Sequence, residues 1–417
     1  MNSGPPRRGK FRITTTGTVL LHIDFLLTGV VMTFLGPMLP SLSVRWSLND
    51  TQSGSLIFAE FFSSLFGMLL SSLSVQRLGY RKTLIIGLAL MPLGVALLAF
   101  GPWLWGLACI CIFGIGYGIT TPAGNLRTAE INPRRSAAAL SVINAVWGIG
   151  AMGSPFLVDL ALRAHQPRLF FFGTAASLVV LLGALALTRF VPDTHIEESE
   201  SAGKVQNIWQ IRILPVICGL FFVYVGSETC FGNWVAMYAR RVAPADHSFA
   251  TRMPAFFWGA LLAGRALAPL ALKFTRETSV ARIGLFLALL GGVALVVARG
   301  TTLIAIGSLL AGLGLASIYP ISVSLLASWF GKASRRVSGA VFGSGNVGGA
   351  LMPLMVGTVS TVAGGLRFGF LVPLAGVVFM LGFYSLEQAK IKTFTTEGTE
   401  FHGGRLAEEN LDDRMNP

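Results

Sequence analysis

The stretch Gly114-Ile-Gly-Tyr-Gly-Ile-Thr-Thr-Pro122 has a counterpart later in the chain, Gly312-Leu-Gly-Leu-Ala-Ser-Ile-Tyr-Pro320. Both copies begin with two alternating glycines and end on a proline, and the offset from position 114 to position 312 is 198 residues. The same offset relates Pro155 to Pro353. A repeat on this scale predicts that the chain is built from two similar halves.

The apolar content around this repeat is too high for a protein surrounded by water. Of the 417 residues, 53% are hydrophobic and 12% are charged, and the mean hydropathy is +0.68. One core could not hide that much apolar surface, so lipid must solvate much of it. Apolar runs of near bilayer length predict twelve transmembrane helices, six in each half. They fall near residues 17–39, 52–74, 83–101, 103–126, 136–160 and 169–188, and then 211–239, 252–273, 280–298, 301–326, 337–362 and 366–386.

Polar segments separate and follow the two sets of spans. We predict an N-terminal six-helix half over residues 1–190, a cytoplasmic linker over 191–210, a C-terminal six-helix half over 211–387 and a cytoplasmic polar tail over 388–417. Basic residues are more frequent in the segments on the side of the termini than in those on the other side. This bias predicts a multi-pass protein of the plasma membrane, as in the bacterial inner membrane, with both termini cytoplasmic.

Several classes of function are disfavoured by composition. The formal net charge of +13 comes from short basic clusters between apolar runs, which is a topology pattern rather than a nucleic-acid surface. All four cysteines fall in predicted spans, so neither a disulfide framework nor a metal site is expected. The chain has no nucleotide-binding loop and no catalytic constellation. We therefore expect no enzyme, no cofactor and no nucleic-acid partner, and a monomer in contact with membrane lipid.

The loop between the second and third predicted spans resembles a family motif. Residues 72–82, Ser-Leu-Ser-Val-Gln-Arg-Leu-Gly-Tyr-Arg-Lys, are similar to the pattern G-x-L-x-D-R-x-G-x-R-K of the major facilitator superfamily. Arg77, Gly79, Arg81 and Lys82 match, whereas the family's acidic position is Gln76. The resemblance implies an all-α membrane protein with the major facilitator fold, two pseudo-symmetric six-helix halves. It also implies a gating role for Arg77 and Arg81 on the cytoplasmic side.

The seventh and eighth spans are similar to those of one group within that superfamily, the proton symporters of fucose, galactose and glucose. The matching segments are Tyr224-Val-Gly-Ser-Glu-Thr-Cys-Phe-Gly-Asn-Trp234 and Trp258-Gly-Ala-Leu-Leu-Ala-Gly-Arg265. The group's first-helix carboxylate has no counterpart near Gly36, since Asp24 lies about three turns earlier. The resemblance implies a sugar as the small-molecule substrate and protons, or sodium, as the coupling ion.

Charges inside the spans are few and need an explanation. Each costs at least about 2.5–3.5 kcal/mol on insertion scales, so it requires a partner or a wet cavity. Glu228 and Arg265 both lie near the bilayer midplane and are expected to pair. Protonation of Glu228 would then free Arg265 for a solute hydroxyl, although a permanent structural pair is the alternative.

Two further acids and one arginine are less constrained by the pattern. Asp24 is expected either to relay protons or to hold a basic group such as Arg127 at the inner gate. Arg127 itself lies near a helix end. Glu60 is expected to be a gate or an exposed residue near the headgroups of the outer leaflet.

Aromatic and polar residues supply candidate solute ligands. Tyr224, Glu228 and Phe231 share one helical face, which suits a sugar because its hydroxyls need polar groups and its C–H faces pack on rings. Asn233 and Trp234 can join that face only if the helix unwinds near Gly226 or Gly232. Thr121 and Asn125 share one face of the fourth span, where Asn125 could bind a solute hydroxyl or hydrogen-bond a neighbouring helix. The remaining candidates, for each of which core packing is the favoured alternative, are Asn144, Trp147, Trp258, Tyr319 and Asn346.

Together these patterns favour a secondary active transporter. The leading interpretation is a proton-coupled symporter of a hexose or deoxyhexose that works by alternating access. The alternative is a proton-coupled efflux antiporter of drugs or metabolites. The fifth span argues against that alternative, because Gly150-Ala-Met-Gly-Ser-Pro155 lacks the Gly-Pro junction and the final glycine pair typical of drug antiporters.

Overall fold

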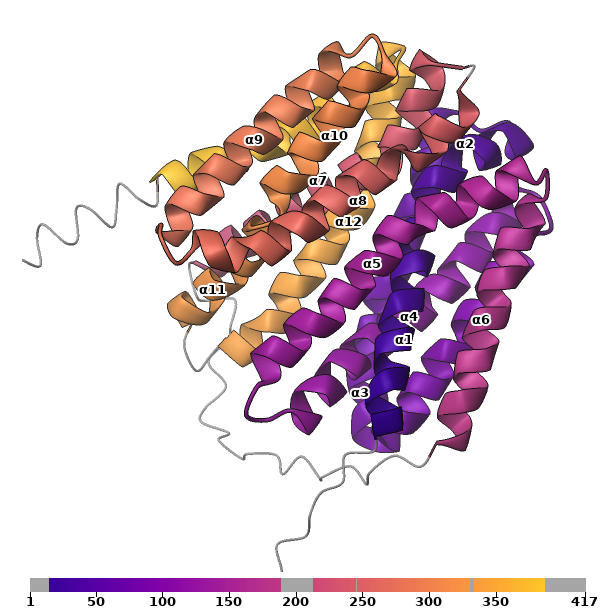
Figure 1. Ribbon diagram of the computed structural model, residues 1–417, viewed down its shortest axis with the longest axis vertical. Coiled ribbons are helices and arrows are strands. Elements are labelled where there is room, and N and C mark those ends of the chain that lie inside the picture. Colours follow the sequence, from indigo (N-terminus) through magenta and orange to yellow (C-terminus); the bar gives the residue numbers. More distant parts are fainter. Residues whose placement is uncertain (1–14, 189–212, 245, 331–333, 387–417) are drawn as a thin grey trace, which may run out of the picture.

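The computed structural model describes residues 15–188, 213–244, 246–330 and 334–386. Every regular element in that part of the chain is helical, so the all-α prediction is confirmed (Figure 1). The predicted linker, 191–210, and tail, 388–417, lie outside the described residues. In chain order the helices are α1 (Thr15–Thr33), α2 (Leu35–Trp46), α3 (Asp50–Leu97), α4 (Trp103–Ile131), α5 (Ser136–Arg163), α6 (Pro167–Leu187), α7 (Leu214–Val242), α8 (His247–Ala271), α9 (Glu277–Val297), α10 (Thr301–Leu315), α11 (Ile318–Phe330), α12 (Ser334–Ala363) and α13 (Leu366–Gly369), followed by a helix over 371–386.

The number of membrane crossings depends on a break at Gly79 within the longest helix. Within the described residues eleven helices are long and apolar enough to cross a membrane. One of them, α3, has 48 residues, and Gly79 inside it adopts φ 76° and ψ 169°. About 20 residues cross a bilayer, so α3 is two crossings, 50–78 and 80–97, joined at Gly79. A positive φ is easy only for glycine, which explains this glycine in the matched motif. With α3 counted as two crossings, the described helices are consistent with twelve spans.

Two other spans are interrupted at prolines. Pro37 lacks an N–H group and cannot bond to the carbonyl of Thr33, the last residue of α1. In the same way Pro320 cannot bond to Ala316, the residue that follows α10. Each interruption lasts one or two residues, so α1 and α2 form the single span Thr16–Trp46, and α10 and α11 form Thr301–Phe330.

Two bundles lie side by side in the structure (Figure 1). We call α1–α6 the N-terminal half and α7 to residue 386 the C-terminal half. The halves meet where α3 packs on α12, α5 on α8, and α2 on α7. These three helix pairs therefore form the interface on which any movement of one half against the other depends.

The repeat seen in the sequence is present in the packing. In the N-terminal half Gly94 of α3 lies against the carbonyl of Cys109 in α4, where an added Cβ would approach the oxygen to 2.5 Å. In the C-terminal half Gly291 of α9 lies against Gly307 of α10, where the distance would be 2.6 Å. Cys109 and Gly307 are 198 residues apart, and the two glycines 197. The same correspondence relates the contact of Gly114 with Glu60 to that of Gly312 with Phe257.

One end of the bundle is closed by charged contacts between the halves. We call the end that holds Thr15, Gly79 and residue 386 the terminal end. The other end, which holds the turn at 47–49 and the C-terminal end of α7, we call the opposite end. There Asp50 of α3 accepts hydrogen bonds from Arg241 of α7, with Nη1 to Oδ2 2.8 Å, and from Ser360 of α12.

A second contact of the same kind joins α5 to α8. Asp159 accepts hydrogen bonds from Arg252, with Nε to Oδ2 2.6 Å, and from Ser248. The side chain of Asp159 is only 2% exposed, so this carboxylate is enclosed between the halves. We call these six residues, Asp50, Arg241, Ser360, Asp159, Arg252 and Ser248, the seal. The seal holds the two halves together at the opposite end.

Substitution of Gly348 should destabilise the fold through its helix contact. A Cβ at this position of α12 would lie 1.9 Å from the carbonyl oxygen of Phe222 in α7, so Gly348→Ala must separate the two helices, at a cost of about 1–3 kcal/mol. We expect a lower midpoint of thermal unfolding for the purified protein in detergent. Gly183→Ala is the control, since no atom lies within 4 Å of its added Cβ. Equal midpoints for the two variants would contradict the packing described here.

Candidate functional site

The structure brings the expected pair of midplane charges together. Nη2 of Arg265, in α8, lies 3.3 Å from both carboxylate oxygens of Glu228, in α7. The same nitrogen donates to the hydroxyl of Tyr224, one turn before Glu228, at 3.1 Å. The helical spacing of four residues places Tyr224 and Glu228 on one face. One guanidinium thus holds both polar groups of α7.

An aromatic ring from a third helix completes this cluster. The ring of Tyr319, in α11, lies 5.9 Å from Cζ of Arg265 and 5.8 Å from the ring of Tyr224. The side chains of Arg265 and Glu228 remain 30% and 12% exposed. The pair is therefore not fully enclosed by protein, and a solute could compete with either member for the other. We call Tyr224, Glu228, Arg265 and Tyr319 the C-terminal cluster.

Asn233 and Trp234 do not join this cluster, because α7 is continuous through Gly226 and Gly232. The amide of Asn233 donates to the carbonyl of Thr229 at 3.0 Å. The indole N–H of Trp234 donates to the carbonyl of Pro353 at 3.1 Å, and its side chain is fully buried. The unwinding on which their role depended is absent from this described helix, so both serve packing in this conformation.

A second polar group lies in the N-terminal half. Asn144 of α5 donates to the side-chain oxygen of Asn125 in α4 at 3.3 Å. The hydroxyl of Thr121 and the indole nitrogen of Trp147 are buried. The hydroxyl of Tyr117 lies beside both. Hydroxyl and indole N–H groups gathered in this way can also hydrogen-bond a solute. Tyr117 was missed by the sequence analysis, although it stands in the middle of the repeated stretch.

The two polar groups are linked across the interface of the halves by tryptophans. The rings of Trp147, in α5, and Trp258, in α8, meet edge to face with centroids 5.8 Å apart. Trp258 also covers Gly232, where an added Cβ would lie 2.6 Å from the indole ring. Gly232 is one turn from Glu228, so the tryptophan pair lies close to the C-terminal cluster.

Asn346 has a different position from the other candidates. Its side-chain oxygen accepts from Ser64 of α3 at 3.1 Å, and its amide nitrogen lies 3.2 Å from the carbonyl of Phe342. These bonds tie α12 to α3 and occupy the amide. Asn346 therefore joins the two halves in this conformation rather than offering a free polar group.

The basic residues expected at the gate occupy separate environments. Arg127 is buried, pairs with Glu130 at 2.8 Å and lies 5.5 Å from the ring of Tyr80. Arg81 donates to the carbonyl of Ala186 at the end of α6. Arg77 is exposed. Arg81 thus joins α3 to the end of α6, and Arg127 of α4 lies against Tyr80 of α3.

The two remaining acids are fully buried. Asp24 in α1 and Glu60 in α3 are both 0% exposed. In the part of the chain that the structure describes, none of their four carboxylate oxygens has a hydrogen-bond partner. Asp24 therefore does not hold Arg127 in this conformation. The expectation that Glu60 is exposed near the headgroups is wrong, because helix packing encloses it.

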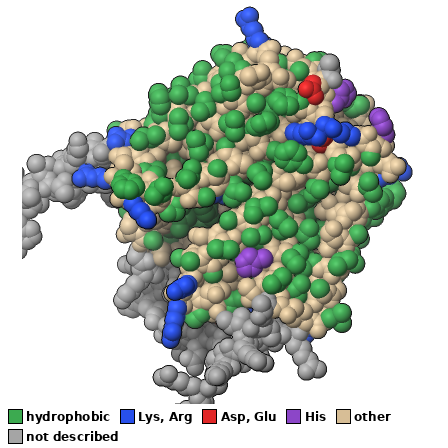
Figure 2. Space-filling model, viewed as in Figure 1, with side chains coloured by type: hydrophobic (Ala, Val, Ile, Leu, Met, Phe, Trp, Pro, Cys, Tyr) green, Lys and Arg blue, Asp and Glu red, His purple; other side chains and the backbone are tan. Residues whose placement is uncertain are grey.

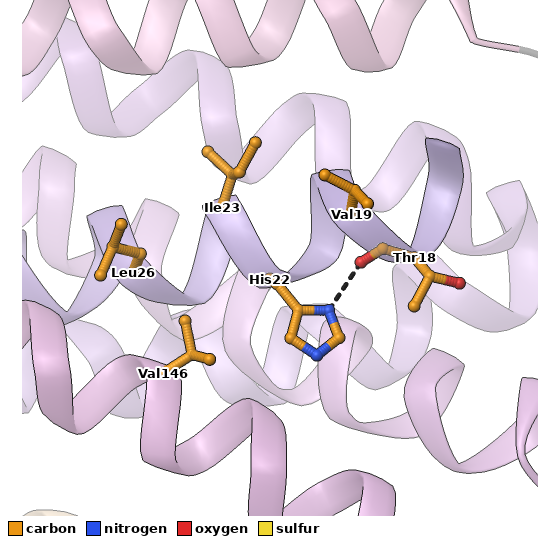
Figure 3. A pocket seen from close by; sticks show the side chains of 6 residues that line it. All are labelled: Thr18, Val19, His22, Ile23, Leu26 and Val146. Carbon is orange, nitrogen blue, oxygen red and sulfur yellow. Dashed lines mark hydrogen bonds between the residues drawn. The ribbon is translucent and has the colours of Figure 1, made fainter. Parts of the chain in front are cut away.

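The described part of the face shown in Figure 2 offers no comparable set of polar groups. Hydrophobic side chains cover the face shown in Figure 2, with charged ones mainly toward its edges. A shallow groove of about 310 Å³ lies between α1 and α5, where Nδ1 of His22 is 2.7 Å from the carbonyl oxygen of Thr18 (Figure 3). Its other lining residues are apolar, Val19, Ile23, Leu26 and Val146. The groove contains none of the candidate residues and resembles a lipid-facing surface.

Removing one member of the Glu228–Arg265 pair should cost more stability than removing both. Arg265→Gln leaves a carboxylate in the membrane without its guanidinium, whereas the double variant with Glu228→Gln leaves two neutral amides. We expect a coupling energy of about 0.5–3 kcal/mol from a double-mutant cycle on thermal unfolding. Arg77→Gln, at an exposed position, is the control. Additive effects of the two substitutions would show that the pair contributes nothing.

Comparisons with known proteins agree with this architecture. A model of the Major Facilitator Superfamily matches residues 23–245. The glucose/galactose transporter of Brucella abortus biovar 1 (strain 9-941) is 26% identical over 389 residues, which cover 89% of this chain and 93% of that relative. The chain is thus similar to this transporter over most of its length.

Solved structures share the fold at lower identity. The nucleoside transporter NupG matches with a TM-score of 0.72 and 13% identity, over 91% of this chain and 99% of that one. A variant of the E. coli fucose:proton symporter FucP matches with a TM-score of 0.60 and 20% identity, over 90% of this chain and 99% of that one. Likeness at this level of identity shows the fold and leaves the solute open.

Proposed function

Because the chain belongs to the Major Facilitator Superfamily, we propose that it is a proton-coupled symporter of a hexose or deoxyhexose. The observation that carries the proposal is the C-terminal cluster, in which Arg265 holds Glu228 and Tyr224 beneath the ring of Tyr319. The similarity over most of its length to a bacterial glucose/galactose transporter supports a sugar as the solute. The protein acts, in this proposal, as a monomer in the bacterial inner membrane.

A sugar fits the chemistry of both polar groups. Its hydroxyls need donors and acceptors, which Arg265 and Glu228 provide from one side and Asn125 and Asn144 from the other. The Thr121 hydroxyl and the Trp147 N–H, which lie beside the Tyr117 hydroxyl, are further donors in this group. The C–H faces of a sugar ring pack on aromatic rings, and Tyr319, Trp147 and Trp258 supply them.

Proton coupling is proposed to act through Glu228. The ion pair with Arg265 offsets the negative charge of the carboxylate while water can reach it. A proton on Glu228 weakens that attraction and frees donors of Arg265 for the solute, so proton and sugar binding support each other. Asp24, buried without a partner, is a second proposed proton carrier on the path from the terminal end. We favour a proton over sodium because Arg265 already occupies the carboxylate oxygens.

Alternating access is proposed to depend on the seal. With both termini cytoplasmic, as the basic residues suggest, the sealed end faces outward and the structure is closed on that side. Separation of Asp50 from Arg241 and of Asp159 from Arg252 would let the halves part there. Rocking of the halves about the midplane would then expose the two polar groups to each side in turn.

Uptake by purified protein in liposomes tests this proposal. Under an inward proton gradient we expect accumulation of a hexose or deoxyhexose, screened beside drug-like cations. Glu228→Gln should abolish gradient-driven accumulation, because the amide cannot cycle a proton, while equilibrative sugar exchange continues.

Glu277→Gln is the matched control, since Glu277 is an exposed carboxylate at the start of α9. It should retain accumulation. Unchanged accumulation by Glu228→Gln would disprove the coupling role of that residue. Export of cations in exchange for protons, without any sugar uptake, would instead support the alternative of an efflux antiporter.

A further inference from the structure

Glu60 occupies the middle of the first crossing of α3, far from any headgroup. It follows Asp50 of the seal by ten positions, which corresponds to about 15 Å along a helix. Its side chain is 0% exposed, and neither carboxylate oxygen has a hydrogen-bond partner among the described residues. A carboxyl group in this position is a costly feature for a fold to keep.

The face of α3 that carries Glu60 lies between α4 and the opposing half. Ser53, Ile57, Glu60 and Ser64 recur at helical spacing and are all fully buried. On one side the backbone of Glu60 packs against Gly114 of α4. On the other side Ser64 bonds across the interface to Asn346 of α12. The face that carries Glu60 therefore packs on α4 of its own half and, one turn further along at Ser64, on α12 of the other half.

No positive charge in the described structure balances this carboxyl group. The titratable group of α4 within electrostatic reach is the Tyr117 hydroxyl, whereas Arg127 and its partner Glu130 lie at least 13 residues, about 20 Å, beyond Gly114. The span of α12, Val337–Ala363, has no ionisable side chain. On α6 the first turn holds Arg168, and on α2 Arg45 donates to carbonyls at the opposite end.

We propose that Glu60 is a proton-binding site whose occupancy is tied to the seal. With the opposite end closed, the carboxyl group must be neutral, since burial without a counter-charge disfavours the ionised form. When α3 parts from α12, water reaches the carboxyl group and it can release its proton. Tyr117, which lies beside Thr121 and Trp147, connects it to the polar group of the N-terminal half. The inference rests on the alternation of the halves under the proposed function.

The sign of the pH dependence follows from linkage. The sealed conformation holds a proton that the open conformation releases at high pH, so a rise in pH favours the open conformation. Over the range in which the open-state carboxyl group is ionised, the ratio of sealed to open molecules should fall about tenfold per pH unit for one proton. Below that range the ratio should be constant.

Spin labels across the opposite end measure this ratio without any solute. Val44 in α2 and Val362 in α12 are 81% and 83% exposed and lie on different halves. We would label Val44→Cys and Val362→Cys in the full chain, with the four free cysteines replaced, and record distance distributions in lipid nanodiscs as pH is varied. The sealed population should fall with rising pH, and Glu60→Gln should keep it high at every pH.

Two variants keep the test decisive. Glu277→Gln removes an exposed carboxylate outside the proposed proton path and should preserve the pH dependence, while Glu60→Asp keeps a carboxyl group and should preserve it if Glu60→Gln fails to fold. An unchanged pH response in Glu60→Gln, a chain with no response at all, or a response lost in Glu277→Gln would each overturn the assignment. Since the readout needs no transport, failure of sugar uptake would leave this result interpretable on its own.

Discussion

The cost of placing a charge in hydrocarbon governs where this chain keeps its few ionisable groups. At the midplane Glu228 and Arg265 share hydrogen bonds with Tyr224, at the opposite end Asp50 and Asp159 pair with arginines, and near the terminal end Arg127 pairs with Glu130. Each of these groups therefore has a partner of opposite charge, which lowers the cost of placing it in lipid surroundings. Asp24 and Glu60, which have no partner in the described structure, are the groups for which a proton is the simplest compensation.

Three helices, α3, α7 and α8, each carry one ionisable group near the midplane and one in the seal. In α7 Glu228 precedes Arg241 by 13 residues, and in α8 Arg252 precedes Arg265 by the same number. In α3 Asp50 of the seal precedes Glu60 by ten. A helix is stiff over this length of about 15–20 Å, so a movement that breaks the seal also shifts the midplane groups. The glycine contacts between α3 and α4, repeated between α9 and α10, let the helices within each half move as packed units.

Much of the fold could be predicted because the lengths of the apolar runs and the internal repeat can be recognised in the sequence alone. The pairing of Glu228 with Arg265 could be predicted from their depth. The seal could not, since Asp50 and Arg241 are 191 positions apart and the arginines were interpreted as topology signals alone. The burial of Glu60 could not be predicted either. Helical spacing shows which residues share a face of a helix, but it does not identify what packs against that face. Tyr117 was overlooked since aromatic residues between glycines usually serve packing.

Sugar movement that carries protons with it is the central claim, and a direct measurement of both fluxes tests it. Purified protein in weakly buffered liposomes, with a pH-sensitive dye outside, should remove protons from the medium when sugar is added outside in the absence of a gradient. The proton uptake should scale with the sugar that enters and should vanish in Glu228→Gln. Sugar entry without any change in external pH, or acidification of the medium, would contradict proton symport.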